Sequence, residues 1–477
     1  MPPQSRRLRP GYSYDVEGWS FAPNLYRGLL RLDRGLDVRP DLADRVAVSA
    51  DGSAYRFRLR ADLRWSDGQP LCAADFAFTY RAMQERSVNT AHLLAGLECE
   101  AVDERTVELR LRNPQPYFPY LLAQAPLFPW PRHCVEALGE AWREPGAFVG
   151  NGPFVLAERT DEGLVFAANP LWDGPHGNVA EVGIDFRLPK DGLDAWRRGR
   201  LDFLFSSDRF ELAEAPDTIE RRVPLLGVAY VGFNRQLPPL DDERVRRALA
   251  HALDRDRVSD EVGSELARGG FIPPAMPGHS HDLALPFDPD RARTLLAEAG
   301  FPGGRGLPEL ETVFVDFGFS AEFRREIEAR WRSPFPGLGV RVRCRWVAAN
   351  VRASSGELAQ KLAVVGPGIG QAHLWSWGWN ADYPDPDGML GTFLEKMGPT
   401  AGHPEMDLVA RARASRSRDE RLRLYREIDR ALVAERVEVV PVDYDAWFLV
   451  HRPWIEGLWA TPTQLGSLEE VVVRRPS

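Results

Sequence analysis

Segments with the pattern of a β-strand alternate with segments of helical character along the whole of this chain. From Tyr55 to Arg60, apolar and charged side chains alternate, as they do in a strand that buries one face. Residues 73–83 then have helical character, and residues 106–112 form a second alternating segment. Such a mixture of elements predicts an α/β protein with more than one sheet.

Longer helices and further strands are expected in the second half of the chain. The helices are expected at residues 241–258, 288–299 and 418–435, and the strands at residues 228–233 and 437–450. Pro289 just inside the second helix and Gly300 just past it are typical of a helix start and a helix end. Ser417 is expected to cap the third helix, with Glu420 completing a capping box.

The length of the chain requires more than one hydrophobic core. A single core rarely serves more than about 300 residues. A chain of 477 residues is therefore expected to form two or three lobes. Asn151, Gly152 and Pro153 together interrupt the pattern of strands and helices, so we place one boundary near residue 150.

Charge and cysteine content exclude some classes of function. The formal charge of −9 argues against a general nucleic-acid-binding protein, because such a protein needs a basic surface. The four cysteines are Cys72, Cys99, Cys134 and Cys344, and none lies in a Cys-x-x-Cys pair. This spacing leaves a zinc site or a redox motif unsupported and predicts buried free thiols.

The first residues do not resemble an export signal. Arg6 and Arg7 suggest a twin-arginine signal, but Arg9 and Pro10 follow them in place of an apolar core. A lipid-attachment cysteine is not found there either, and no stretch reaches the ~18 apolar residues that span a membrane. A cytoplasmic location is therefore one expectation for this chain.

Recognisable catalytic motifs are missing from the sequence. It contains no Gly-x-Ser-x-Gly elbow, no phosphate-binding Walker loop and no His-Glu-x-x-His pattern. The glycine-rich residues 366–370 miss the spacing of a dinucleotide-binding loop, so we expect a flexible loop there. His279 and His281 offer two imidazoles without a third ligand in view, which favours a surface loop over a metal site. We expect no catalytic residue, cofactor or metal.

The acidic segment at residues 382–388 has the composition of a calcium-binding loop but not its register. Aligning Asp385 and Asp387 with an EF-hand puts Tyr383 at the first ligand position and Leu394 at the twelfth. Two prolines also stiffen the segment. We therefore expect a rigid acidic loop.

Three tryptophans precede that loop at alternate positions. If the segment is a strand, Trp375, Trp377 and Trp379 share one face of it. Core packing is the favoured interpretation for the first two, whereas Trp379 stands nearest the acidic loop. An aromatic wall beside a carboxylate suits a cationic, partly apolar ligand. Gly378 allows a ligand or another backbone to approach closely.

Short motifs follow one another in a specific order from about Asn24 to the C-terminus. They lie at residues 24–30, 51–60, 65–70, 75–76, 150–154, 169–170, 233–234, 238–242, 245–246, 381–386, 440–441 and 453–457. In this order they resemble the family 5 extracellular solute-binding proteins, which are the oligopeptide-, dipeptide- and nickel-binding components of ABC importers. Each motif is short, and their common order makes the resemblance specific.

The resemblance implies a bilobal, periplasmic-binding-protein-like clamp (type II, cluster C) with a small additional domain inserted in the first lobe. The ligand would bind between the lobes, which close by hinge motion. The implied first lobe consists of residues 1–35, 150–235 and 450–477, the inserted domain of residues 36–149 and the second lobe of residues 236–449.

The resemblance also implies where a ligand binds. Asp382 matches the aspartate that holds the α-ammonium group of a peptide, and Trp379 matches an aromatic residue that lines the pocket. The expected ligand-binding residues are Gly378, Trp379, Asn380, Asp382 and Tyr383. Ser376 stands where some oligopeptide binders carry an arginine, so the carboxyl end of a peptide needs another partner.

We therefore expect a non-catalytic, monomeric binding protein that delivers short peptides, or a similar amine-bearing solute, to the membrane permease of an ABC importer. The resemblance implies an extracytoplasmic location, either periplasmic or at the cell surface. A cytoplasmic ligand-sensing or carrier protein on the same clamp is the alternative. A biosynthetic enzyme that uses the closed cleft to exclude water is a third.

Overall fold

The computed structural model divides the chain into two compact units. It describes residues 7–8, 10–12, 21–85, 96–160, 162–185, 192–206, 217–258, 265–316, 321–348, 372–396 and 403–475. Unit 1 consists of residues 1–223 and 447–477, and unit 2 of residues 224–446. Two long strands, β13 (Ile219–Phe233) and β18 (Val439–His451), each contain residues of both units.

Unit 1 contains a mixed sheet in the order β18, β12, β2, β11, β10, β9. Its strands are β1 (Arg7–Leu8), β2 (Pro10–Tyr12), β9 (Phe154–Thr160), β10 (Gly163–Ala168), β11 (Glu181–Asp185) and β12 (Phe203–Ser206). Strands β9, β10 and β11 are antiparallel neighbours, whereas β2 runs parallel to both β11 and β12. Phe166, Val182 and Phe203 are fully buried in the core on this sheet.

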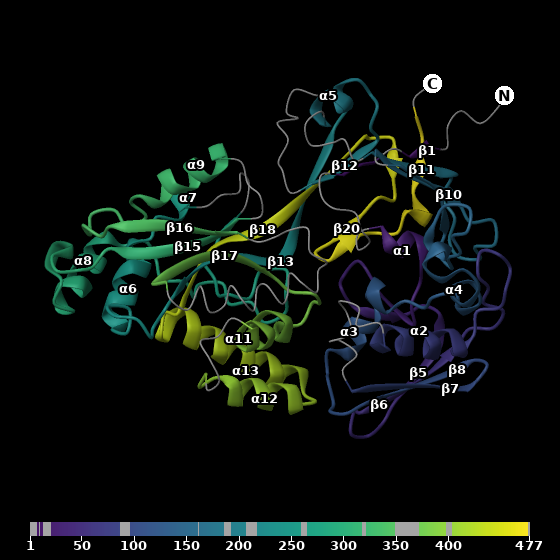
Figure 1. Cartoon of the computed structure of the whole chain (residues 1–477), viewed down its shortest axis with the longest axis horizontal. Helices are drawn as coiled ribbons and strands as arrows, with labels where there is room; N and C mark the ends of the chain where they lie inside the picture. Colours follow the sequence, from purple (N-terminus) through teal and green to yellow (C-terminus); the bar gives the residue numbers. More distant parts are fainter. Residues whose placement is uncertain are drawn as a thin grey trace. The chain divides into compact units, whose positions relative to one another are not determined.

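A second, antiparallel sheet of unit 1 has the order β5, β6, β8, β7. Its strands are β5 (Ala43–Val48), β6 (Ala54–Leu59), β7 (Leu97–Asp103) and β8 (Thr106–Leu111). Helix α2 (Ala73–Glu85) packs along it (Figure 1). Along β6, Phe57 is buried and Arg56 is exposed, with its Nε donating to Glu108 Oε2 over 2.9 Å. These contacts confirm the half-buried strand, the second alternating strand and the helix that the sequence predicts here.

Shorter elements complete unit 1. They are α1 (Ala22–Leu25), β3 (Leu30–Leu32), β4 (Val38–Pro40), α3 (Phe118–Leu122), η2 (Ala125–Leu127), α4 (Arg132–Leu138), η3 (Gly139–Arg143), α5 (Gly192–Arg197), β19 (Ile455–Glu456), β20 (Ala460–Thr461), β21 (Gln464–Leu465), η7 (Leu468–Glu470) and β22 (Val472–Val473). The segment after β18 returns to the chain start, because Leu468 N–H donates to Asn24 Oδ1 over 2.7 Å.

Unit 2 contains a sheet in the order β16, β15, β17, β13, β18, with β14 paired to β18. The strands not yet given are β14 (Glu265–Leu266), β15 (Leu310–Asp316), β16 (Val342–Ala348) and β17 (Leu374–Asn380). Its helices are α6 (Glu243–Ala252), α7 (Arg255–Val258), α8 (Pro289–Glu298), η4 (Pro302–Gly304), α9 (Ala321–Trp331), η5 (Asp387–Gly391), α11 (Thr392–Lys396), α12 (Met406–Ala414), α13 (Arg418–Arg430) and η6 (Ala431–Glu435).

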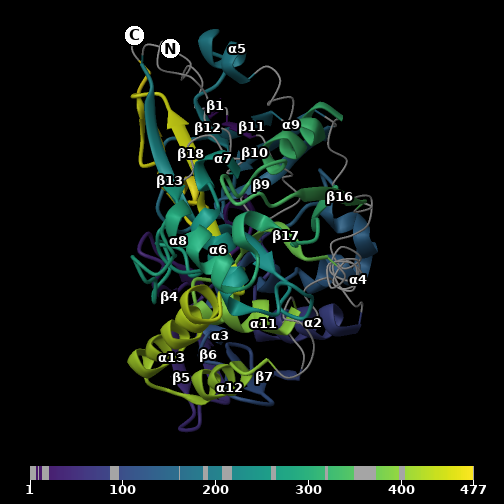
Figure 2. The same cartoon turned by 90° about the vertical axis from the view of Figure 1, so that its left-hand side faces the viewer.

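Two groups of helices complete unit 2. Helices α6, α8 and α9 share a core with β13, β15 and β17, in which Leu249, Leu296 and Trp331 are buried. Helices α12 and α13 pack against each other and run side by side in both views (Figure 1, Figure 2). Both α12 and α13 also contact η5, at the end of the acidic loop.

The helix expected at residues 241–258 is wrong as a single element. The structure has two helices there, because the backbone is extended at Leu253 and the Asp254 amide donates to Pro334 O over 3.2 Å. The helix expected at 288–299 is confirmed as α8, with Asp288 accepting from the Arg291 amide over 2.9 Å. The break between the two helices could not be predicted from local sequence, because Pro334 lies 80 residues from Asp254.

The cap expected at the start of α13 is half confirmed. Ser417 Oγ accepts from the Glu420 amide over 3.3 Å, as a capping residue does. The reciprocal arm of the capping box is wrong, because Glu420 Oε2 accepts from the Ser415 hydroxyl over 2.7 Å. The helix itself continues through a wider turn at η6, so its expected length is confirmed.

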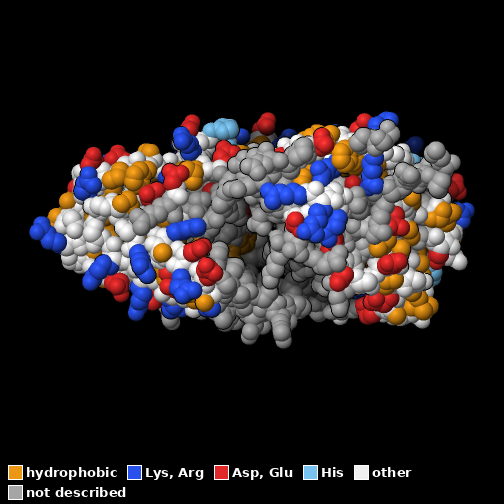
Figure 3. Space-filling model, turned by 90° about the horizontal axis from the view of Figure 1, so that it is seen from above, with side chains coloured by type: hydrophobic (Ala, Val, Ile, Leu, Met, Phe, Trp, Pro, Cys, Tyr) orange, Lys and Arg blue, Asp and Glu red, His pale blue; other side chains and the backbone are white. Residues whose placement is uncertain are grey.

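Charged side chains of both signs are interspersed on the face of the molecule in Figure 3. No helix among the described residues is both long and apolar enough to cross a membrane. The cysteines of the described chain are free: Cys134 is buried, and Cys72, Cys99 and Cys344 are half-buried. The expected burial of the thiols is thus complete only for Cys134.

Candidate functional site

Strand β17 carries the tryptophan segment and pairs with β13 over its whole length. The pairing is antiparallel, with Trp375 opposite Gly232, Trp377 opposite Tyr230 and Trp379 opposite Val228. Residues directly opposite in an antiparallel pair point to the same face of the sheet. The three tryptophans therefore share one face, as the sequence predicts.

That face becomes more open toward the end of β17. Trp375 is 8% exposed, and a methyl group at Gly232 would overlap its ring. Trp377 and Trp379 are half-buried. Core packing is thus confirmed for Trp375, while Trp377 is only partly enclosed.

Trp379 is held in position by two contacts. Its Nε1–H donates to Gly388 O over 3.0 Å, and its ring meets the Phe393 ring edge-on at a centroid distance of 5.7 Å. Phe393 in turn packs against Tyr230 and Phe271. The indole plane is therefore fixed by the protein, as an aromatic wall must be if it is to position a ligand.

The opposite face of β17 is open at its end. Gly378 is exposed, and a Cβ placed on it would meet no atom within 4 Å. Asn380 is exposed as well, two residues further along the same face. Since side chains on a strand alternate between faces, Gly378 and Asn380 lie on the side away from Trp379.

Asp382 lies two residues after the end of β17, on an exposed position of the acidic loop. The loop leaves the sheet in a fixed direction, because the Ala381 amide donates to Leu226 O over 2.9 Å. Tyr383 then turns inward and is 5% exposed, with its hydroxyl donating to Asp387 Oδ2 over 3.0 Å. Asp382 is therefore exposed, whereas the Tyr383 hydroxyl is used inside the loop.

The second carboxylate of the loop, Asp385, is buried against Arg421 of α13. Arg421 Nη2 lies 2.7 Å from both Oδ1 and Oδ2. Burial raises the pKa of the Asp385 carboxyl, and the charge of Arg421 opposes this effect. Asp385 Oδ1 also accepts from the Asp387 amide over 3.0 Å, which closes the turn.

The third carboxylate, Asp387, is fully buried at the start of η5. Its Oδ1 accepts from Arg413 Nε and from the Tyr425 hydroxyl, each over 2.6 Å. Arginines of α13 and α12 thus bind Asp385 and Asp387, which are buried, whereas Asp382 is exposed. These ion pairs anchor the acidic loop, which the sequence predicts to be rigid.

Asp445 of β18 is a residue that the sequence reasoning missed. It makes a hydrogen bond with the Asn380 side chain, and a methyl group at Gly227 would overlap both side chains. Burial, and then the neighbouring Asp443, raise the pKa of Asp445 to about 7. Two aspartates inside an otherwise apolar strand were the available signal, because charged residues are rarely placed in a buried strand without a role.

The remaining sequence candidates do not join this site. His279 Nδ1 lies 2.6 Å from Ile272 O, and its ring contacts those of His281 and Tyr444. Burial lowers the pKa of His279, so the imidazole is neutral near pH 7. The glycine-rich segment at residues 366–370 lies outside the described residues.

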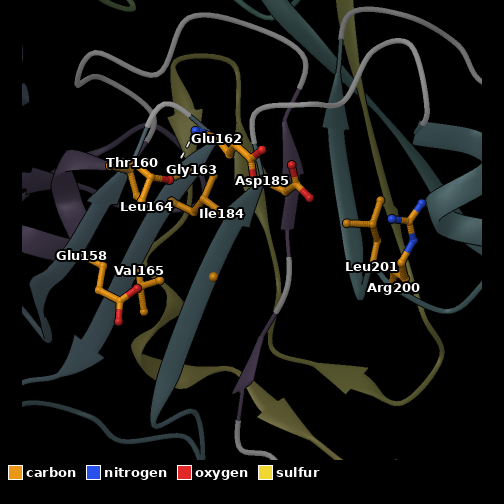
Figure 4. Close-up of a pocket in the computed structure, with 11 residues that line it drawn as sticks. Glu158, Thr160, Glu162, Gly163, Leu164, Val165, Ile184, Asp185, Arg200 and Leu201 are labelled. Carbon is orange, nitrogen blue, oxygen red and sulfur yellow. Dashed lines mark hydrogen bonds between the residues drawn. The ribbon is translucent and has the colours of Figure 1, made fainter.

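A cavity of about 470 Å³ lies in unit 1 on the hairpin of β9 and β10. Figure 4 shows Glu158 and Val165 toward one end, Glu162 and Asp185 at the hairpin tip, and Arg200 across from them. Three of these five side chains are acidic and none is aromatic. The cavity therefore lacks the aromatic wall and the fixed anchor found at the end of β17.

Comparison with known proteins gives a consistent result. The family model described as bacterial extracellular solute-binding proteins, family 5 Middle, matches residues 37–400. A probable deoxycholate-binding periplasmic protein of Escherichia coli, YgiS, is 27% identical over 91% of this chain and 85% of its own length. The periplasmic oligopeptide-binding protein OppA of the same organism is 26% identical over 91% of this chain and 84% of its own.

Solved structures extend the likeness to the fold. HbpA2 from Haemophilus parasuis has a TM-score of 0.80 at 20% identity, covering 98% of this chain and 100% of that one. The Escherichia coli murein tripeptide binding protein MppA has a TM-score of 0.71 at 22% identity, covering 98% and 99%. The mixed α/β fold of these binding proteins therefore extends over nearly the whole of this chain.

Proposed function

The chain belongs to the bacterial extracellular solute-binding proteins, family 5, and from this premise we propose that it captures short peptides, or a similar amine-bearing solute, for an ABC importer. It is a binding protein of that family and not an enzyme. The observation that carries the choice of ligand is the exposed position of Asp382 on a loop that Arg413 and Arg421 anchor through Asp387 and Asp385.

Asp382 is the proposed partner of the ligand's ammonium group. A fixed carboxylate on a rigid loop holds a cation without the entropic cost of ordering the loop on binding. Trp379, three residues before Asp382 in the sequence, offers a fixed aromatic ring, which suits a cation that carries apolar groups. On the opposite face of β17, Asn380 and Gly378 supply a polar group and an open backbone.

The finer architecture is part of the same proposal. We assign residues 36–149 to a small additional domain, which is supported by the separate antiparallel sheet β5–β8 with α2. The two lobes of the clamp would then be residues 1–35 with 150–235 and 450–477, and residues 236–449. Two connecting strands, β13 and β18, suit hinge closure of such a clamp.

Location and partners follow from the relatives. OppA and YgiS are described as periplasmic, and we propose an extracytoplasmic location and a membrane permease as partner for this chain too. The protein would act as a monomer. A cytoplasmic carrier on the same clamp remains the alternative, and fractionation of cells that express the native gene separates the two.

A bile acid is the rival ligand, because one relative is described as a probable deoxycholate-binding protein. A bile acid carries a carboxylate and no ammonium group, so an exposed Asp382 would repel it. Calorimetry with deoxycholate beside short peptides decides between them. If the protein binds deoxycholate and Asp382→Asn leaves that affinity unchanged, the steroid is the favoured ligand.

The test of the proposal is isothermal titration calorimetry with short peptides and their N-acetylated counterparts. Removing one partner of a buried ion pair costs about 2–5 kcal/mol. Asp382→Asn is therefore expected to weaken binding by about 1.4 to 3.5 decades at about 1.4 kcal/mol per decade. N-acetylation of the peptide should cause a similar loss in the wild-type protein.

Two controls make the result specific. Asp407→Asn removes an exposed carboxylate from α12 of the same unit and is expected to leave affinity unchanged. In the Asp382→Asn variant, N-acetylation should add little further loss, because both changes remove the same interaction. Independent, additive losses would show that Asp382 does not contact the ammonium group.

A further inference from the structure

Three side chains with different metal-binding chemistry converge in unit 1. Asp67 lies in the turn that follows Trp65, and His133 and Cys134 lie in the first turn of α4. One ligand atom from each of the three lies within 4.8 Å of the other two. The sequence separates Asp67 from the other two residues by 66 positions or more, so spacing alone could not reveal the group.

Two of the three side chains are already in contact. His133 Nε2 lies 2.6 Å from Asp67 Oδ2. The other oxygen, Oδ1, accepts from the Gln69 amide over 3.0 Å, which fixes the carboxylate in the turn. Cys134 is 8% exposed, whereas the side chains of His133 and Asp67 are 37% and 31% exposed. The group is thus closed by the thiol on one side and open to solvent on the other.

The geometry is compatible with a tetrahedral metal ion. Zinc binds nitrogen at about 2.0–2.1 Å and carboxylate oxygen at about 2.0–2.2 Å, which places two such ligands about 3.3 Å apart. The 2.6 Å contact between His133 and Asp67 must therefore open by less than about 1 Å. Both side chains are partly exposed, and small rotations about their χ angles supply this movement.

We propose that Asp67, His133 and Cys134 form a zinc(II) site with three protein ligands and a water molecule in the fourth position. A thiolate and an imidazole together select zinc over magnesium and calcium, which prefer oxygen ligands only. Formation of the zinc–sulfur bond releases the thiol proton to solvent, and no electron is transferred. A zinc ion here ties the turn after Trp65 to the first turn of α4.

The alternative is a simple ion pair between His133 and Asp67, in which the Cys134 thiol lies nearby and binds no metal. Cobalt(II) distinguishes the two, because it takes the place of zinc and reports on its ligands by absorption. A site with Cys134 as ligand gives a thiolate-to-cobalt charge-transfer band and the intense visible bands of tetrahedral cobalt. An ion pair with no metal site gives neither.

The experiment adds cobalt(II), and then zinc(II) as competitor, to the full chain after treatment with a chelator. We expect one equivalent of cobalt to produce the charge-transfer band and zinc to remove it. Cys134→Ser should abolish the band, and Asp67→Asn should weaken zinc binding by at least about 100-fold, since even outer-shell partners contribute 10–100-fold. The asparagine keeps an oxygen that accepts from the Gln69 amide, so the turn is preserved.

Matched controls come from the rest of the chain. Cys344→Ser changes a half-buried thiol of unit 2, and His176→Asn changes an exposed imidazole of unit 1 outside the group. Both variants should bind cobalt and zinc as the wild type does. The proposal is overturned if the wild type shows no thiolate band, or if the band survives in Cys134→Ser.

Discussion

Asp429 is a buried carboxylate of α13 whose protonation should control stability. It is fully buried, its Oδ1 accepts from the Phe271 amide over 2.7 Å, and a methyl group at Gly270 would overlap it. Burial raises the pKa of Asp429 from the ordinary 3.8 to about 7. The side chain is therefore a neutral acid in the folded protein over much of the acidic range.

The sign of the pH dependence follows from this raised pKa. Between pH 4 and pH 7 the folded state holds a proton at Asp429 that the unfolded state has lost, so stability falls as pH rises through this window. A pKa difference of about 3 corresponds to stabilisation on the order of 4 kcal/mol that is present below pH 4 and lost above pH 7. Asp445 contributes with the same sign.

Asp429→Asn should flatten the pH dependence without removing all of it. The asparagine can still accept from the Phe271 amide but cannot titrate. Urea unfolding at pH 5, 6, 7 and 8 is expected to show a smaller decrease in the midpoint for this variant than for the wild type. Asp407→Asn, an exposed change in the same unit, should keep the wild-type slope. Equal slopes for Asp429→Asn and the wild type would contradict the assignment.

Helix α13 and the acidic loop form one structural element through the Arg421–Asp385 ion pair. Arg421→Met should leave a buried, unpaired carboxylate, which costs about 3–5 kcal/mol. The variant is expected to unfold at lower urea concentration and to bind peptide more weakly, because the loop that carries Asp382 loses its anchor. Hydrogen exchange of the amides at residues 381–391 should accelerate.

The control lies two residues away on the same helix. Arg423 pairs with Glu427 over 3.4 Å, and both side chains are more than half exposed. Arg423→Met is therefore expected to change stability by no more than about 0.5 kcal/mol. If the two variants lose similar stability, the buried pair does not anchor the loop.

These elements also show what the sequence can predict and what it cannot. Strand β17 with its tryptophans on one face and α8 with its aspartate cap both follow from local patterns. The arginines that fix the loop do not, because Arg421 lies 36 residues after Asp385 and Arg413 lies 26 after Asp387. Strand β13 begins at Ile219, nine residues before its expected start. Pro224 lies in its first half, and a proline argues against a strand in the sequence pattern.

Part of the candidate site could not be predicted from local sequence patterns either. The resemblance drew attention to residues 378–383, and the order of motifs carried the family assignment that the family model confirms. Asp445 joins Asn380 only because β17 and β18 both neighbour β13 in the sheet. Strand order of this kind is set by the packing of the whole unit, which no local pattern encodes.

The two units are joined by two chain crossings, between Val223 and Pro224 and between Ala446 and Trp447, within β13 and β18. In the clamp that we propose, the units would rotate about these strands, and a ligand bound by both would favour the closed arrangement. Small-angle X-ray scattering should therefore record a smaller radius of gyration when peptide is added to saturation.

Asp382→Asn provides the matched test of that closure. At a peptide concentration about tenfold above the wild-type dissociation constant, the wild type is mostly bound, while a variant weakened by about 1.4 decades or more is mostly free. The wild type should contract and the variant should not, and raising the peptide concentration should restore contraction in the variant. A radius of gyration that stays constant in the saturated wild type would show that ligand capture does not close the two units.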